Sequence, residues 1–336
     1  LSAALPAAAG PMPIARRTAG ILVADLSLDA VYLCRDLNGN GNAMDPGEAT
    51  VFFDGSNASG LGVPTGSVFA LFQSCDGTVY VADGDTDTVY ACLDRNGDGD
   101  ANDAGEARVW FSSFNQSFIT LPTPNGVCEG ADGAIYITNS GTSASPQDGL
   151  YRTIDLNGDG DADDAGESTI FVDETAIGIT NATPFGCSLR GGDVCFLDLR
   201  GSAPNVVLAA HDANGDGSVS AAELGTFYVE GGVVPAPCTF TCASDGTSIY
   251  THESSSGAVQ TVWKLTDVDG SGSIDQANEG VSVWSETSLP AGVTMSQSFA
   301  FTLGPGMIAI ASSGTDPNDE VIVARDLNGD GDYNDA

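Results

Sequence analysis

Residues 94–106 read DRNGDGDANDAGE, and close variants of this segment occur five more times in the chain. The six copies begin at Asp36, Asp94, Asp155, Asp212, Asp267 and Asp326, so that successive starts lie 58, 61, 57, 55 and 59 residues apart. So regular a spacing indicates one supersecondary unit per copy. No Pro/Ser-rich linker or abrupt change in composition divides the 336 residues. We therefore expect one domain built from repeats.

Within a copy, oxygen-bearing side chains stand at positions 1, 3 and 5, and glycine stands at position 6, as in Asp94, Asn96, Asp98 and Gly99. Short oxygen side chains at alternate positions can wrap around one hard cation, and glycine permits the sharp turn that this requires. The pattern resembles the calcium-binding loops of EF-hands and dockerins over about twelve residues per copy. This resemblance implies about six Ca²⁺ ions, one for each copy.

The candidate metal ligands occupy equivalent positions in the six copies. They are Asp36, Asn38, Asn40, Asn42 and Glu48; Asp94, Asn96, Asp98, Asp100, Asp103 and Glu106; Asp155, Asn157, Asp159, Asp161, Asp164 and Glu167; Asp212, Asn214, Asp216, Ser218 and Glu223; Asp267, Asp269, Ser271, Ser273 and Glu279; and Asp326, Asn328, Asp330 and Asp332. Glu223 closes its copy at position 12, as in an EF-hand, whereas copies one, two, three and five place the closing acid at position 13. The closing acid therefore reaches the cation by a different backbone path in those copies.

The charge distribution supports bound cations. The chain has 46 acidic and 10 basic residues, a net charge of −36, and 25 of the acids lie in the six copies. Carboxylates this close together repel one another and oppose folding unless a divalent cation neutralises them. So few basic residues exclude a nucleic-acid-binding surface. A hydrophobic content of 42% excludes a disordered acidic tail.

The segments around the copies have the pattern of strands. DAVYLCRD and DTVYACLD precede copies one and two, and EATVFF and EARVWF follow them. Farther upstream of the third copy, two more strand candidates are joined by a tight turn at Asp132-Gly133. Other repeats have equivalent turns at Asp76-Gly77, Gly191-Gly192 and Asp245-Gly246. Each repeat therefore predicts a four-stranded antiparallel meander rather than a helix pair.

Six such meanders predict an all-β fold, a six-bladed β-propeller of four-stranded antiparallel blades with calcium-binding loops between strands 3 and 4. The strand pattern around Pro124-Asn125-Gly126 and Asp132-Gly133 is similar to that of NHL-repeat and gluconolactonase-type propellers. In an up-and-down meander, the tight turns and the calcium loops emerge on one face. The loops from strand 2 to 3 and from one blade to the next emerge on the other.

The two chain ends leave alternatives open. Residues 1–17 are predicted to be an N-terminal segment, which is a signal-peptide remnant, a first inner strand or a closing strand, and residues 18–336 are predicted to form the single propeller domain. The sixth copy stops at Ala336, before its closing acid and a fourth strand. Either the natural chain continues, or Leu1–Leu5 supply the missing strand.

The N-terminus and the cysteines favour export. LSAALPAAAGPM resembles the small-residue end of a signal peptide, and no apolar run is long enough to span a membrane. An even number of cysteines, eight, suits an oxidising compartment. Cys187 with Cys195 and Cys238 with Cys242 are candidate local disulfides, and buried free thiols are the alternative. We expect a protein that is secreted or on the cell surface, extracellular or periplasmic.

Two functions compete. In the first, Ca²⁺ stabilises each blade of a secreted structural, surface-assembly or binding module, whose partners are calcium ions and other copies of itself or a cell-surface component. In the second, the resemblance to gluconolactonase-type propellers implies a calcium-dependent hydrolase with a metal over the central channel. Only Asn125 matches a metal-binding residue of that family, because Phe185 replaces an acid and the early Glu-Gly is missing around Pro11–Ile14.

Other polar residues carry weaker signals. Asp83, Asp85 and Asp87 are either an additional cation site or a solvated acidic loop. His252 and Glu253 are a candidate acid and base pair. The two histidines of the chain, His211 and His252, do not form a Ser/His/Asp pattern. We therefore assign no catalytic residue from the sequence.

Overall fold

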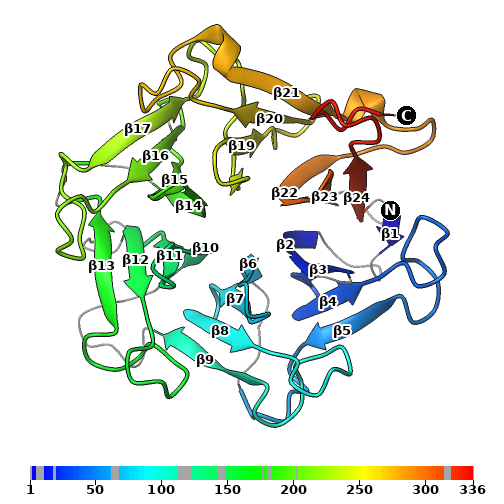
Figure 1. Cartoon of the computed structure of the whole chain (residues 1–336). Coiled ribbons are helices and arrows are strands. Elements are labelled where there is room, and N and C mark those ends of the chain that lie inside the picture. The colour runs from blue at the N-terminus through cyan, green and yellow to red at the C-terminus, as the bar shows by residue number, and fades with distance from the viewer. Residues whose placement is uncertain are drawn as a thin grey trace. The chain divides into compact units, whose positions relative to one another are not determined.

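The computed structural model describes residues 2–4, 11–17, 20–61, 68–112, 123–141, 148–175, 177–179, 183–201, 203–313 and 319–335. These residues form six sheets of four strands each, which we call blades 1 to 6 (Figure 1). Two short 3-10 turns, η1 (Ala277–Glu279) and η2 (Glu286–Ser288), are the helical elements of this part of the chain. No helix in the described ranges is long and apolar enough to cross a membrane.

The strands follow one another in sequence order within each blade. Blade 1 contains β2 (Pro11–Arg17), β3 (Gly20–Asp25), β4 (Ala30–Cys34) and β5 (Ala49–Phe53), and blade 2 contains β6 (Val68–Gln73), β7 (Val79–Asp83), β8 (Thr88–Cys92) and β9 (Ala107–Ser112). Blade 3 contains β10 (Pro124–Glu129), β11 (Ile135–Asn139), β12 (Gly149–Thr153) and β13 (Ser168–Asp173), and blade 4 contains β14 (Pro184–Arg190), β15 (Asp193–Asp198), β16 (Val206–Ala210) and β17 (Leu224–Val229). Blade 5 contains β18 (Ala243–Ser244), β19 (Ile249–His252), β20 (Thr261–Leu265) and β21 (Gly280–Ser285), and blade 6 contains β22 (Gln297–Gly304), β23 (Met307–Ser313), β24 (Glu320–Arg325) and β1 (Ser2–Ala4).

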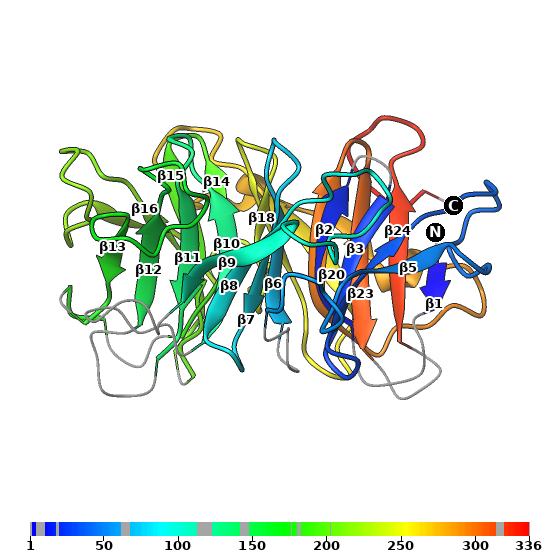
Figure 2. The ribbon, with the colours of Figure 1, turned by 90° about the horizontal axis from the view of Figure 1, so that it is seen from below.

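The predicted antiparallel meander is confirmed in the blades. The Gly191-Gly192 turn joins β14 to β15, whose register pairs Arg190 with Asp193. In each blade the acidic segment follows the third strand, as it does after β12 and β16 (Figure 2). The middle strands are the most buried, because neighbouring strands cover both of their edges and side chains cover both of their faces; all five residues of β7, β8, β11 and β16 are buried.

The fourth strand of blade 6 comes from the N-terminal segment. Strand β1 pairs antiparallel with β24, with Ser2 opposite Ile322 and Ala4 opposite Glu320. This pairing agrees with the closing-strand alternative, although Leu1 and Leu5 lie outside the described residues. Strand β2 also comes from residues 1–17 and is the first strand of blade 1. The division of the chain at residue 17 stays a prediction.

The chain separates into two compact units, each with its own core. One unit contains residues 1–109, 254–260 and 283–336, and the other contains residues 110–253 and 261–282. In the first unit, Leu22, Phe52 and Phe53 belong to a buried cluster shared by blades 1 and 2. In the second unit, Leu197 and Phe227 belong to a cluster that blades 4 and 5 share. Side chains between adjacent blades therefore form the core.

The cysteines are free thiols, and the two local disulfides are not present. Seven of the eight are buried, and Cys75 is exposed. In blade 4, Cys187 pairs with Phe196 while Cys195 pairs with Ser188, so the two cysteines are one register step apart. Side chains at successive positions of a strand point to opposite faces, which directs these thiols away from each other.

Candidate cation sites

The six acidic segments form loops that curl around their first aspartate. In the third loop, Asp155 accepts hydrogen bonds from the backbone N–H groups of Gly158 at 2.6 Å and Gly160 at 2.9 Å. The first aspartate of every other loop accepts the equivalent bonds. Both glycines have φ between +75° and +107° in all six loops, a backbone conformation that costs other residues energy. This geometry explains a second glycine, at position 4.

The alternate oxygen side chains act as a series of turns. In the third loop, Asn157 Oδ1 accepts the N–H of Asp159 at 2.8 Å, Asp159 Oδ1 that of Asp161 at 3.3 Å, and Asp161 Oδ1 that of Asp163 at 3.0 Å. Each side chain thus binds the backbone two residues later through one oxygen, and the second oxygen of Asp159 also accepts a bond from Asn157 Nδ2 at 3.0 Å. Rotating an Asn amide by 180° exchanges its oxygen and nitrogen, so Asn157 can also present an oxygen.

The folded loops bring position 10 to the candidate ligands. In the third loop Asn157 Nδ2 donates to Asp164 Oδ2 at 2.6 Å. Asp103 and Asp45 take the same place in the second and first loops, where each accepts a bond of 2.6 Å from the position-3 asparagine. In the sixth loop, Asp335 Oδ1 accepts the bond from Asn328 at 2.9 Å. The sequence reasoning omitted Asp45 and Asp335, although a carboxylate ten residues into four of the six copies was a visible signal.

The closing glutamates at position 13 are buried under their loops and hold backbone amides. Glu167 Oε1 accepts the N–H groups of Leu156 and Asn157 at 2.8 and 3.1 Å, and its Oε2 accepts that of Asp164 at 3.2 Å. Glu48 makes the corresponding bonds in the first loop. These glutamates therefore mainly stabilise the loop backbone through hydrogen bonds. In the second loop, Glu106 Oε2 is buried without a hydrogen-bond partner, and so remains available to a cation.

The remaining closing acid and the fifth loop show how the copies differ. Glu223, at position 12, accepts bonds from both the N–H and the hydroxyl of Ser220, at 3.0 and 2.7 Å. In the fifth loop, carboxylate oxygens of Asp267, Asp269 and Glu279 lie within 4.8 Å of one another. No other group of three His, Cys, Asp or Glu side chains among the described residues meets that distance. All three donors are hard oxygen ligands, as Ca²⁺ prefers.

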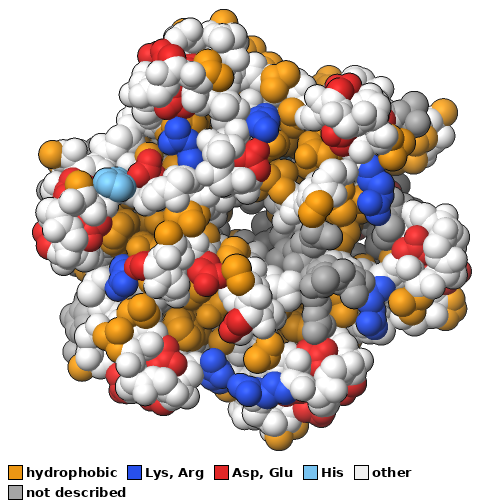
Figure 3. All heavy atoms as spheres, in the orientation of Figure 1, with side chains coloured by type: hydrophobic (Ala, Val, Ile, Leu, Met, Phe, Trp, Pro, Cys, Tyr) orange, Lys and Arg blue, Asp and Glu red, His pale blue; other side chains and the backbone are white. Residues whose placement is uncertain are grey.

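Crowding of the carboxylates and hydrogen bonds from the backbone shift pKa values in the loops in opposite directions. Partial desolvation, together with repulsion from Asp98 and Glu106, raises the pKa of Asp103. At Asp267 burial acts in the same direction, but bonds from the N–H groups of Gly272 and Gly270 outweigh it and lower the pKa. Acidic side chains gather over the loop that joins β16 to β17, at the left edge of Figure 3. Such clusters favour a bound cation.

Five of the six loops also bond to the preceding blade. The N–H at position 8 donates to a carbonyl of the fourth strand one blade earlier: Ala101 to Phe52 at 2.7 Å, Ala162 to Trp110 at 2.8 Å, Val219 to Phe171 at 2.7 Å, Ile274 to Phe227 at 2.7 Å and Tyr333 to Val283 at 2.7 Å. The side chain at position 9 adds a second bond in three loops, where Asn102, Asp163 and Asn334 accept the N–H groups of Asp54, Ser112 and Ser285 at 3.1, 3.0 and 2.9 Å. A cation that orders a loop therefore also orders a junction between blades.

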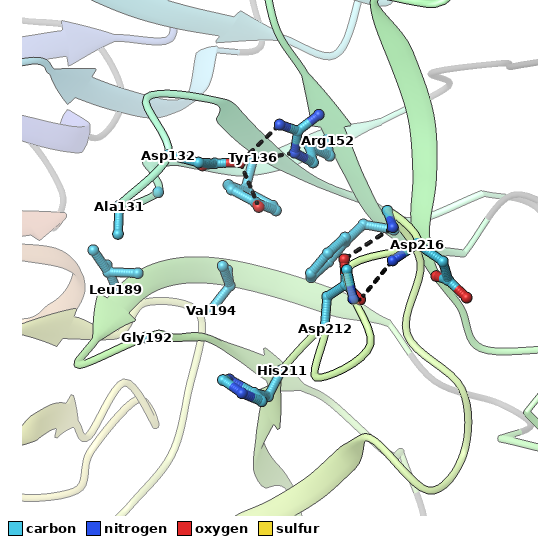
Figure 4. Close-up of a pocket in the computed structure, with 14 residues that line it drawn as sticks. Ala131, Asp132, Tyr136, Arg152, Leu189, Gly192, Val194, His211, Asp212 and Asp216 are labelled. Atoms are coloured by element: carbon cyan, nitrogen blue, oxygen red, sulfur yellow. Dashed lines mark hydrogen bonds and ion pairs between the residues drawn. The ribbon is translucent and has the colours of Figure 1, made fainter.

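A polar cavity lies beside the fourth loop. It has a volume of about 430 Å³ and is lined by residues of blades 3 and 4 (Figure 4). Arg152 Nη2 lies 2.8 Å from Asp132 Oδ2, and His211 Nδ1 lies 2.9 Å from Asp193 Oδ1 near the cavity. Asp212, the first residue of the fourth loop, lines the same cavity, so tight turn and acidic loop emerge together as expected. Among the described residues, the lining includes no serine, threonine or cysteine that could act as a nucleophile.

The residues considered for catalysis do not converge. Asn125 is buried, its Nδ2 donates to Ser140 Oγ at 2.5 Å and to the Pro184 carbonyl at 3.3 Å, and its Oδ1 has no partner. Phe185 packs edge-on against Phe240, with ring centroids 5.6 Å apart, where a second ligand would be needed. His252 is fully buried, and burial lowers its pKa to about 4, against the opposing effect of a hydrogen bond to the Thr239 backbone. It is therefore neutral at physiological pH.

The acidic segment ADGDTDT is a turn at the end of β7. Asp83 is buried, and its Oδ1 accepts the N–H groups of Asp85 and Thr86 at 2.9 and 3.3 Å. Asp87 has a positive φ of 50°. Desolvation, followed by repulsion from Asp83 and Asp85, raises the pKa of Asp87. These contacts account for a structured acidic turn and leave an additional cation site there a prediction.

Comparison with known proteins identifies the fold. No protein-family model matches the chain. No curated protein matches it in sequence either. Among solved structures, it is similar to a PQQ-bound aldose sugar dehydrogenase from Streptomyces coelicolor, with 12% identity, a TM-score of 0.57, and coverage of 96% of this chain and 97% of the other.

Two further solved structures give the same result. A gluconolactonase from Xanthomonas campestris matches with 14% identity, a TM-score of 0.56, and coverage of 94% of this chain and 86% of the other. A carbohydrate-active enzyme of family AA12 from Trichoderma reesei matches with 11% identity, a TM-score of 0.58, and coverage of 97% and 96%. The fold is a six-bladed β-propeller. At sequence identities this low, the similarity shows a shared fold and nothing more.

Proposed function

We propose that the protein is a secreted calcium-binding β-propeller that serves as a structural, surface-assembly or binding module. One observation carries the proposal: loops rich in oxygen donors are bonded through position 8 to the fourth strand of the preceding blade. Ca²⁺ in such a loop would neutralise its carboxylates and fix the junction. The sequence resemblance to EF-hand and dockerin loops supports the choice of metal.

The energetic consequence follows from mass action. A cation that binds the folded loop and not the unfolded chain adds its binding free energy to stability, about 2.7 kcal/mol per site when the free ion is at 100 times its Kd. Among the described residues, a strand precedes every loop and a strand follows each of the first five, in place of the helices that reorient in calcium sensors. Binding energy is therefore available for stability rather than for a conformational signal.

Calcium titration of the chelator-treated protein tests the proposal. We expect about six ions per chain, following the six copies, and a melting temperature that falls when the ions are removed. Asp94→Ala and Asp155→Ala should each lose one ion and keep the fold. Glu129→Gln, which changes a carboxylate outside the loops, is the control and should keep every ion. Identical melting curves with and without chelator would contradict the proposal.

A calcium-dependent hydrolase of the gluconolactonase or lactonase type is the second candidate. The unpartnered, buried Oδ1 of Asn125 favours it, as does the likeness to propellers named as enzymes. Hydrolysis of gluconolactone with and without Ca²⁺ tests it, with Asn125→Ala as the variant. Calcium-dependent turnover that Asn125→Ala abolishes would favour the enzyme. No turnover above buffer would favour the module, for which self-association measured by light scattering is the next assay.

A further inference from the structure

Three acidic residues of the second unit gather at the ends of strands. Glu174 follows β13, Asp148 precedes β12, and Asp198 ends β15 of the next blade. The acidic loop of blade 3 lies between β12 and β13, so the start of β12 and the end of β13 are at the opposite end of the sheet. Strand β15 leaves the Gly191-Gly192 turn and ends on that opposite side as well. This group is therefore separate from the six loops.

Two of the three acids are almost fully buried and have carboxylate oxygens without a hydrogen-bond partner among the described residues. Glu174 is 1% exposed and Asp198 is 0% exposed. Neither carboxylate oxygen of Glu174 has a hydrogen-bond partner, and neither does Oδ1 of Asp198. The Arg200 Nε donates to the other oxygen of Asp198 at 2.6 Å, and the Gly141 N–H donates to Asp148. Arg200 is therefore bonded to one of the three carboxylates.

Burial and repulsion between these acids raise the pKa values of Glu174 and Asp148. Burial, followed by repulsion from Asp198 and Asp148, raises the pKa of Glu174 to about 8, and Arg200 only partly opposes the rise. Burial also raises the pKa of Asp148, with a further contribution from Asp198. A buried carboxylate without donors costs substantial free energy unless a cation or a proton compensates it.

The equivalent glutamate of the next blade, Glu230, has hydrogen-bond donors for its carboxylate at the same position. Glu230 follows β17 as Glu174 follows β13. Its Oε1 accepts the N–H of Cys238 at 3.1 Å, and its Oε2 accepts that of Asn205 at 3.4 Å. The fold can therefore satisfy a glutamate here with backbone amides. Among the described residues, no such donor bonds to the Glu174 carboxylate, and acids at the ends of two neighbouring strands lie near it instead.

We propose that Glu174, Asp148 and Asp198 bind a further divalent cation of the Ca²⁺ type, at the junction of blades 3 and 4. The available donors are carboxylate oxygens, which favour a hard cation over a transition metal. Among the described residues, only Asp267, Asp269 and Glu279 bring three carboxylate oxygens within 4.8 Å. Glu174, Asp148 and Asp198 do not meet that distance, so binding at Glu174 requires their carboxylates to move closer together. The cation neutralises the buried charge and joins the two blades.

The test counts Ca²⁺ ions by equilibrium dialysis in the full chain. Glu174→Gln is expected to lose one ion per chain relative to the unchanged protein, and Asp198→Asn is expected to lose the same ion. Glu230→Gln is the matched control, because it alters an equally placed acid that has its own donors, and it should lose none. Equal ion counts for Glu174→Gln and the unchanged protein would overturn the proposal, as would an equal loss in Glu230→Gln.

A second measurement covers variants that fail to fold. Crystals of the unchanged protein soaked in Tb³⁺, which replaces Ca²⁺ and scatters anomalously, should show a peak between Glu174 and Asp198. A map with peaks in the loops and none at this position would overturn the inference and leave the proposed function standing. A peak only at Glu174 would support the inference and contradict the loop proposal. The two proposals therefore fail separately.

Discussion

Asp163→Ala should weaken the junction between blades 2 and 3. The carboxylate of Asp163 accepts the N–H of Ser112 at 3.0 Å, and Ser112 is only 5% exposed. Removing the acceptor takes this bond away from a buried N–H, and a hydrogen bond to a charged group contributes about 1.5–3 kcal/mol. We expect the free energy of unfolding to fall by about 2 kcal/mol, which lowers Tm by roughly 3 °C in a chain of 336 residues.

Asp163→Asn separates the hydrogen bond from the charge. Asn102 and Asn334 already accept the equivalent N–H groups in the second and sixth loops, so an amide is compatible with this position. Scanning calorimetry at saturating Ca²⁺ should therefore place Asp163→Asn within about 1 kcal/mol of the unchanged protein. If the Asn and Ala variants lose the same stability, or if neither loses any, the loop does not hold the blade through this bond.

Three further predictions concern other parts of the fold. His252 has a pKa of about 4 in the folded chain and 6.5 when free, so the unfolded chain binds more protons between pH 4 and pH 6.5. The free energy of unfolding should therefore fall by about 3 kcal/mol as the pH drops from 6.5 to 4. Urea titrations at several pH values should show a flatter pH dependence for His252→Asn. Only Cys75 should react rapidly with a thiol reagent in the native protein, and all eight cysteines should react in denaturant, since a smaller total would indicate disulfides. Gly126→Ala should destabilise the protein by more than about 2 kcal/mol, because the new Cβ would lie 2.6 Å from Thr138 Oγ1 and 2.7 Å from Gly186 Cα; an unchanged Tm would show that blades 3 and 4 can separate slightly without cost.

The likeness to solved enzyme structures contrasts with the described residues considered for catalysis, which do not converge. The similar solved structures include a dehydrogenase and a gluconolactonase, but their identities are 12% and 14%. Propeller folds support many functions, and function is decided by individual sites. Asn125 has one free oxygen, whereas the neighbouring position holds Phe185 instead of an acid. The acidic loops are the feature that all six repeats share.

Local sequence was sufficient for the strands and the loops. Runs rich in β-branched and aromatic residues predicted β4 and β8, because such side chains favour extended backbone. The acidic loops were predicted with their glycines because each turn forms between residues two to five apart, as between Asp155 and Gly160. The period of the copies then placed one loop after the third strand of every blade.

Contacts between distant residues required the folded chain. The hydrogen bond from the Ala162 N–H to the Trp110 carbonyl joins the loop of blade 3 to blade 2, and neither segment alone specifies it. The same is true of Asp198 beside Glu174, and of cysteines that were expected to pair locally and instead lie one register step apart. A repeating pattern describes interactions within one blade, but the free energy of blade packing depends on side chains that the chain brings together only after its sheets have formed.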